Sequence, residues 1–353
     1  MKKKVIYLSM IFLLLLDYDS FSQDIVSSGQ DIKGSELFMN RQILPLKLSY
    51  SNKDIKKNTN DSTYITSDLS YQLADGSWEN FEVKLRARGS NRLKNCYYAP
   101  IKIKIKKSIA AGTLFEGHKK LKLVLPCLRQ KDKNDNVVKE YMAYKLYEII
   151  SPYHYKTRLV SIDFTEISGT KTKNHKLVGF LMEDIKKIAN RYQGQVVKRS
   201  IHPLNMDNIC SVQNDFFQFM IGNTDFSVAH QHNEKLLFID KKIFPVPYDF
   251  DMSGLVDASY SVVSVVQNEK LNISDVKQRL YRGFKRDEAF YQKVRKEFLD
   301  NKTEMLEIID RLELHFDDPK EFSMAKNFIV SFFEVMVMDQ KFDKNILRKA
   351  RTK

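Results

Sequence analysis

Three oxygen-bearing side chains in one irregular stretch, residues 222–251, have types and spacing that suit chemistry on phosphate groups. Asp225 follows an apolar helix, Asn233 comes eight residues later, and Asp249 follows a short pair of strands. Phosphoryl transfer requires an Asp that orients the acceptor hydroxyl and accepts its proton, together with hard oxygen ligands for Mg²⁺. We therefore predict that Asp225 is catalytic and that Asn233 and Asp249 bind Mg²⁺.

A different metal chemistry is possible with the same stretch. His230 and His232, together with Asp249 and Asp251, are residue types that bind zinc in hydrolytic centres. No third His with helical spacing follows them, so the sequence favours magnesium over this metal-dependent hydrolase. The ordinary role of a single Asp or Asn in such a stretch is to form a turn.

Cationic side chains that would grip the phosphates of a nucleotide donor precede this stretch. Lys120 and Lys122 lie on a predicted strand, and Glu140 lies on the helix that follows, where a partner for the cation is expected. Lys102 and Lys104, on an earlier strand, compete for the same role. Lysines on a strand face are more often simply solvated.

Two further residues in the first half of the chain are expected to contact the nucleotide donor. The run from Arg86 to Arg92 contains Arg88 and a single glycine, so it is weak as a phosphate loop, although its arginines can clamp phosphates. Glu183 stands at the crossover into the second half of the chain. We therefore add Arg88 and Glu183 to the predicted cofactor-binding residues.

The elements that must position these residues change in character along the chain. Alternation of apolar and polar residues predicts strands at 63–73, 80–88, 101–106, 120–125, 157–164 and 176–182, the last two joined by a polar loop at 168–175. A helix is predicted from Asn136 to Ser151, and later helices at 205–221, 287–312 and 319–339. A boundary near Asp184 thus separates a sheet-rich part, residues 24–183, from a mainly helical part, residues 184–353.

Composition and charge restrict the class of protein. The chain has 353 residues, of which 43% are hydrophobic, so it can bury a core and is not disordered. Its net charge of +14 suggests polyanionic partners. The Lys residues are spread along the chain, and no zinc-finger spacing or aromatic RNA-binding motif is present, so sequence-specific nucleic-acid binding is not expected.

The first 22 residues have the order of a secretory signal peptide. Three Lys precede an apolar run from Val5 to Leu16, and small residues at Ser20 and Ser22 favour cleavage before Gln23. The run is shorter than the roughly 20 residues that cross a bilayer. We expect an extracytoplasmic protein, periplasmic or secreted, with no transmembrane span after cleavage. An uncleaved anchor is the alternative.

Three cysteines are present, at positions 96, 127 and 210. In an oxidising compartment Cys96 and Cys127 are the expected disulfide pair, because each flanks a strand-like segment in the first half of the chain. Cys210 opens an apolar helix and is expected to be a buried thiol.

Several of these segments together resemble the spore coat CotH kinase family, and more narrowly a secreted, uncharacterised bacterial branch of it. The resemblance covers roughly residues 80–260 and is carried by Arg86–Arg92, Glu140–Tyr147, Phe180–Asp184, Gly222–Asn233 and Pro247–Asp251. It implies an α+β, two-lobed atypical protein-kinase-like fold, with an N-terminal antiparallel sheet lobe that contains one inserted helix and a mainly helical C-terminal lobe.

The resemblance also implies an activity. CotH-like kinases transfer a phosphoryl group from ATP, with Mg²⁺, to Ser or Thr; here the acceptor would be a protein or another envelope component. Asp225 matches the catalytic-loop Asp, Asn233 the metal-binding amide and Asp249 the metal-binding Asp. The chain departs from ordinary protein kinases because it lacks His-Arg-Asp and has Asp249-Phe250-Asp251 in place of Asp-Phe-Gly. Asp251 is therefore expected to share the metal. A noncatalytic binding module is the alternative, because little ATP is present outside the inner membrane.

Overall fold

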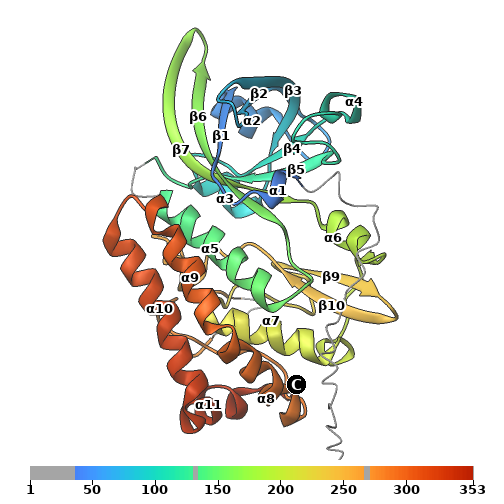
Figure 1. Ribbon diagram of the computed structural model, residues 1–353, viewed down its shortest axis with the longest axis vertical. Helices are drawn as coiled ribbons and strands as arrows, with labels where there is room; N and C mark the ends of the chain where they lie inside the picture. Colours follow the sequence, from blue (N-terminus) through green and yellow to red (C-terminus); the bar gives the residue numbers. More distant parts are fainter. Residues whose placement is uncertain (1–35, 130–133, 266–270, 353) are drawn as a thin grey trace, which may run out of the picture.

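The computed structural model describes residues 36–129, 134–265 and 271–352 (Figure 1). The signal peptide expected at residues 1–22 lies outside these ranges. Two clusters of buried apolar side chains organise the described chain. One fills the interior of a β-barrel, and the other lies between the outer face of that barrel and the helices of the second half. No helix within the described ranges is both long and apolar enough to cross a membrane.

Seven strands form the barrel, in the order β1-β2-β3-β4-β5-β7-β6. Their bounds are β1 Leu44–Tyr50, β2 Ile65–Gln72, β3 Trp78–Ala87, β4 Ile101–Lys104, β5 Lys120–Val124, β6 Thr157–Ser168 and β7 Lys171–Glu183. The alternation that predicted the strands is visible in their burial: Ile101 and Ile103 are fully buried, whereas Lys104 is exposed. One side chain of each pair points into the barrel because successive residues of a strand face opposite ways.

The predicted two-lobed kinase-like fold with an antiparallel N-terminal sheet lobe is wrong, because the structure has a closed mixed barrel. Strand β1 pairs in parallel with β6, with Leu44 opposite Val160, and this pairing closes the sheet into a mixed barrel. Strand β1 was not among the predicted strands. Even with β1 identified, its partner would not follow from local alternation, because the two strands are far apart in the chain and parallel pairing leaves no hairpin signal.

Helices in the first half are more numerous than the single one predicted. Four short ones pack around the barrel: α1 Glu36–Met39, α2 Asn52–Asn58, α3 Ser90–Asn95 and α4 Lys107–Ala110. The predicted inserted helix is α5, Asn134–Ile150. It lies against the outside of β7, where the rings of Tyr144 and Phe180 are 5.4 Å apart. Strand β7 is thus covered on both faces, which explains its nearly continuous apolar run.

The polar loop predicted at 168–175 is also wrong. Strands β6 and β7 continue through it, and the chain reverses at Gly169, whose φ of +60° suits a tight turn. The resulting hairpin projects well beyond the barrel (Figure 1). Both faces of the projecting part are largely exposed, so both carry polar residues, and no apolar face alternates with a polar one.

The second half contains a small antiparallel sheet and the remaining helices. The sheet has the order β10-β9-β8, with β8 Gln195–Val197, β9 Glu234–Ile239 and β10 Lys242–Pro247. The α-helices are α6 Ile185–Arg191, α7 Asn208–Met220, α8 Glu288–Asp300, α9 Lys302–Leu312, α10 Pro319–Val337 and α11 Asp339–Asn345. Short 3₁₀ helices lie at Pro203–Asn205, Glu313–His315 and Leu347–Lys349. The stretch predicted as helical from 287 to 312 is broken at Asn301.

The predicted disulfide between Cys96 and Cys127 is confirmed, and the Cα atoms of the two residues are 4.4 Å apart. It joins the end of α3 to the chain that leaves β5, where the Tyr97 amide also donates a 2.7 Å hydrogen bond to the Cys127 carbonyl. Cys210 is a buried free thiol, as predicted.

Candidate functional site

The β9–β10 hairpin brings Asn233 and Asp249 together. Glu234 at the start of β9 lies opposite Pro247 at the end of β10, so the residues just outside the two strands face each other. The Tyr248 amide donates a 3.0 Å hydrogen bond to the Asn233 carbonyl, and Asp249 is the next residue. Asn233 and Asp249 both have positive φ, 52° and 66°, a conformation that Asn and Asp tolerate better than most residues.

The end of α7 places Asp225 beside this hairpin. Gly222 has φ +63° and a ring atom of Phe328 would lie 2.9 Å from any Cβ there, so only glycine makes this exit from the helix without strain. Asn223 then accepts a 2.9 Å hydrogen bond from the Asp225 amide. The Arg282 guanidinium donates to the Thr224 carbonyl at 2.6 Å and holds the backbone on the other side.

Both carboxylate oxygens of Asp225 accept hydrogen bonds. Oδ1 accepts from His232 Nε2 at 3.0 Å and from Ser264 Oγ at 2.7 Å, and Oδ2 accepts from Asn233 Nδ2 at 2.9 Å. Burial alone would raise the pKa of Asp225, but the hydrogen bonds from His232, Ser264 and Asn233 outweigh it and lower the pKa below its ordinary value. Asp225 is therefore an ionised, tightly oriented carboxylate at neutral pH.

Asn233 and Asp249 keep free oxygens. Asn233 donates both of its described hydrogen bonds through Nδ2, to the Asp225 side chain and carbonyl, which leaves Oδ1 as an acceptor. Among the described residues, no hydrogen-bond donor lies within 3.5 Å of the Asp249 carboxylate. No cationic side-chain nitrogen of these residues lies within 4.0 Å of it either. These two oxygen donors fit Mg²⁺, which takes one or two protein ligands together with substrate phosphates.

Asp251 has a different environment from Asp249. It is buried, accepts a 3.1 Å hydrogen bond from the Tyr260 hydroxyl and lies 3.6 Å from Arg92 Nε. Its side chain is thus engaged with a phenol and a guanidinium, which suits a structural role better than metal binding. The described part of the chain contains no group of three or more His, Cys, Asp or Glu side chains placed to hold a metal ion, a set that does not count the amide of Asn233.

A cavity of about 500 Å³ connects these residues with the barrel. Its lining includes Arg88, Asp225, Asn233, Tyr248, Asp249 and Ser264. The structure therefore brings together the predicted catalytic residue, the three predicted metal ligands, Asp251 included, and one predicted phosphate contact, from segments of the chain that are far apart in sequence. Ser264 was missed because it lies in a stretch with no recognisable pattern.

Two cationic side chains lie near this cavity: Arg88 is part of its lining, and Lys122 lies behind the lining residue Tyr248. The Arg88 Nε is buried and has no acceptor among the described residues. Lys122 is half-buried, and its ammonium lies 4.7 Å from the centre of the Tyr248 ring. Burial, and then the charge of Arg88, lower the pKa of Lys122 to about 7, although Asp249 partly opposes them. Lys120, by contrast, is exposed on the same strand.

Glu140 does not pair with a lysine. It lies 3.6 Å from Arg92, and Arg92 also donates a 3.1 Å hydrogen bond to the Leu125 carbonyl. Glu183 is occupied elsewhere, because it accepts hydrogen bonds from Arg191 at 2.6 Å and 2.8 Å and from the Lys156 amide at 2.8 Å. Neither glutamate lines the cavity. The unpredicted Glu140–Arg92–Asp251 cluster braces the wall of the cavity instead.

The two histidines of the alternative zinc centre are separated. His232 bonds to Asp225, whereas His230 lines two other cavities. Their alternation along the chain turns them in different directions, so this loop offers a weak ligand set for zinc.

The lowered pKa of Lys122 leads to a pH-dependent prediction. At pH 6 wild type should bind Mg²⁺ with a nonhydrolysable ATP analogue at least about tenfold more tightly than Lys122→Met, because the ammonium is then charged. By pH 8 this advantage should shrink about tenfold, since the proton is largely lost above pH 7. The ratio of the two dissociation constants, measured by calorimetry, cancels the titration of the nucleotide. Lys120→Met serves as the control and should match wild type.

No protein-family model matches the sequence, and no curated protein matches it either. The arrangement of its own side chains is therefore the basis for assigning a function to this site.

Proposed function

We propose that the chain is a Mg²⁺-dependent phosphotransferase that moves the terminal phosphoryl group of ATP to a hydroxyl of a protein or envelope component. The observation that carries the proposal is the Asp249 carboxylate, which has no described partner and lies beside the Asn233 amide in the same cavity as Arg88. A free anion and a free cation facing one space suit a metal-bound phosphate better than either ion alone. The resemblance to CotH kinases supports the same reaction.

Each residue has a distinct role in this mechanism. Asn233 Oδ1 and the Asp249 carboxylate would hold Mg²⁺, which when bound neutralises charge on the phosphates. Arg88 and charged Lys122 lie where they would bind phosphate oxygens from the barrel side. Asp225 accepts a hydrogen bond from the acceptor hydroxyl and orients its oxygen toward the phosphorus.

The transfer balances within the cavity. The acceptor oxygen forms a bond to the γ-phosphorus as the bond between that phosphorus and the β,γ-bridging oxygen breaks, so ADP leaves with the electron pair. The hydroxyl proton passes to Asp225. Because hydrogen bonds lower its pKa, Asp225 is a weak base and acts mainly by orientation, as a loose phosphoryl-transfer transition state requires.

Labelled ATP and Mg²⁺ test the proposal directly. Wild type should transfer label to itself or to an envelope extract, and Asp225→Ala should reduce the initial rate at least ~100-fold, because general-base and orienting residues contribute 10²–10⁴-fold. Binding of the nonhydrolysable analogue should change little, since Asp225 does not contact phosphate in this mechanism. Ser227→Ala, a nearby polar change outside the cavity, is the matched control.

The outcomes separate the proposed enzyme from the alternative. Nucleotide binding without transfer by wild type would favour a noncatalytic binding module. Equal labelling of wild type and Asp225→Ala would show that transfer, if present, does not use this residue. Absence of both binding and transfer would overturn the phosphotransferase proposal. The Cys96–Cys127 disulfide favours carrying out these assays without reductant, because such bonds persist in oxidising compartments.

A further inference from the structure

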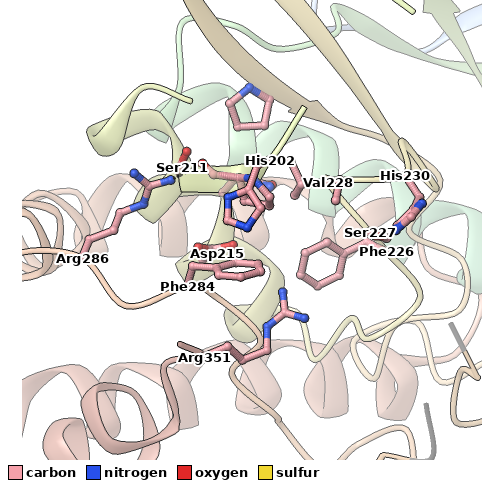
Figure 2. A pocket seen from close by; sticks show the side chains of 14 residues that line it. His202, Ser211, Asp215, Phe226, Ser227, Val228, His230, Phe284, Arg286 and Arg351 are labelled. Atoms are coloured by element: carbon pink, nitrogen blue, oxygen red, sulfur yellow. Dashed lines mark hydrogen bonds between the residues drawn. The ribbon is translucent and has the colours of Figure 1, made fainter. Parts of the chain in front are cut away.

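A second polar cavity, of about 300 Å³, is lined by the segment that follows Asp225, from Phe226 to His230 (Figure 2). One wall is helix α7, and other walls are the segment from Phe226 to His230 and the chain around Phe284 and Arg351. It shares no lining residue with the cavity of the proposed phosphotransferase site. None of its residues has a role in the proposed function.

The α7 wall presents hydrogen-bond acceptors that lack donors. Ser211, Asn214 and Asp215 lie at positions i, i+3 and i+4 of the helix and therefore share one face. Ser211 Oγ and Asn214 Oδ1 are buried without a hydrogen-bond partner among the described residues. Asp215, on the same face, is only 9% exposed. Burial raises the pKa of Asp215 to about 7 although three arginines oppose it.

Two arginines that line the same cavity present donors. Arg286 and Arg351 line the cavity, and the Nε atom of each is buried and has no acceptor in the described part of the chain. Arg286 is anchored by its terminal nitrogens, which donate to Asn208 and to the Pro203 carbonyl. The Arg351 guanidinium lies 4.3 Å from the centre of the Phe284 ring, and Figure 2 shows it between that ring and Phe226.

The two walls together define the chemistry of a ligand. A simple anion would leave the acceptors on α7 without donors, and a simple cation would leave the Nε atoms of the two arginines without acceptors. A molecule with a cationic donor group at one end and a carboxylate at the other satisfies both walls. The rings of Phe226 and Phe284 offer an apolar surface between them, which suits a hydrocarbon side chain.

We propose that this cavity binds a free α-amino acid with an apolar side chain, with its ammonium group at Asp215 and its carboxylate at Arg351 and Arg286. Buried polar atoms without partners are costly in a protein, so a set of donors and acceptors of this kind around one cavity is best explained by a ligand that satisfies them. The volume accommodates one such molecule and excludes a peptide of several residues.

Binding of leucine and of its two fragments tests this inference with the full mature chain. Leucine should bind with one-to-one stoichiometry in calorimetry and raise the melting temperature. 3-Methylbutylamine, which lacks the carboxylate, and 4-methylpentanoate, which lacks the amine, should each bind at least tenfold more weakly. Equal binding of 4-methylpentanoate and leucine would overturn the proposal in favour of a plain anion site. Failure of leucine, valine and phenylalanine alike to bind would also overturn it.

Variants locate the binding. Asp215→Asn should weaken leucine binding at least tenfold, because it removes the negative charge that the ammonium group of leucine would meet. Arg351→Gln, near the chain end, should weaken leucine binding without loss of folding and keeps the test decisive if Asp215→Asn does not fold. Asp225→Ala lies outside this cavity and should bind leucine normally. Unchanged leucine binding in both cavity variants would place the amino acid elsewhere and overturn the assignment.

Discussion

Replacing Asp249 by Asn is expected to reduce kcat/KM for phosphoryl transfer by on the order of 10³-fold or more, the scale seen when a charged group is lost from a phosphoryl-transfer site. The carboxylate has no described partner in the folded chain, so its loss should leave the fold intact. Asn also tolerates the positive φ of 66° at this position. The effect should therefore appear in activity and in Mg²⁺-dependent nucleotide binding, with the melting temperature almost unchanged.

Asp240→Asn provides a matched control for this experiment. Asp240 is exposed at the opposite end of the same hairpin and also has a positive φ, 46°. Asp240→Asn makes the same chemical change as Asp249→Asn, but at a position away from the cavity. Activity should therefore stay within about twofold of wild type, as for most surface substitutions. If Asp249→Asn retained activity within tenfold of wild type while nucleotide still bound, Asp249 would not be a metal ligand.

Loss of the Cys96–Cys127 disulfide is expected to lower the free energy of unfolding by about 3 to 4 kcal/mol, because the bond closes a loop with a sequence separation of 31 residues. The Cys96→Ala, Cys127→Ala double variant should show this loss in urea unfolding. Nucleotide binding should weaken as well. The Cys96 amide donates a 2.9 Å hydrogen bond to the Arg92 carbonyl, so the disulfide at Cys96 also fixes the end of the helix that carries Arg92.

Reductant supplies an internal control for the disulfide prediction. Dithiothreitol should destabilise wild type by about as much as the double substitution, and it should have no effect on the double variant. Cys210→Ala removes a buried thiol but no covalent link, so it should remain sensitive to reductant. Equal stability of reduced and oxidised wild type would contradict the prediction.

Local patterns predicted many elements of the fold but not how they close. Alternating Ile and Lys at 101–105 specified a strand with one buried face, and the spacing of tyrosines specified α5. Barrel closure depends on β1 finding β6, and no local pattern records a parallel partner more than a hundred residues away. The same limit explains the error at 168–175, where a projecting hairpin has no buried face to reveal it.

The same limit applies to the candidate site: residues placed by local structure were predicted, and contacts between distant segments were not. Asp225, Asn233 and Asp249 were predicted because a helix end and a hairpin place them locally, and the structure brings them together. Partners of buried charges were not predicted, since Glu140 could pair with any nearby cation and only the packed structure selects Arg92. Ser264 was found from the structure alone, because a lone serine carries no sequence signal of its contact with Asp225.

The parallel pairing of β1 with β6 also has a consequence for folding during translation. Arg158 at the start of β6 bonds to the Gln42 carbonyl just before β1, across 116 residues of chain. A ribosome delivers β1 long before β6 exists, so an unpaired strand edge must wait for its neighbour while most of the barrel is still being made. Late closure of this kind slows folding and leaves an unpaired strand edge that is prone to aggregation. A chaperone that binds the newly made chain would reduce this aggregation.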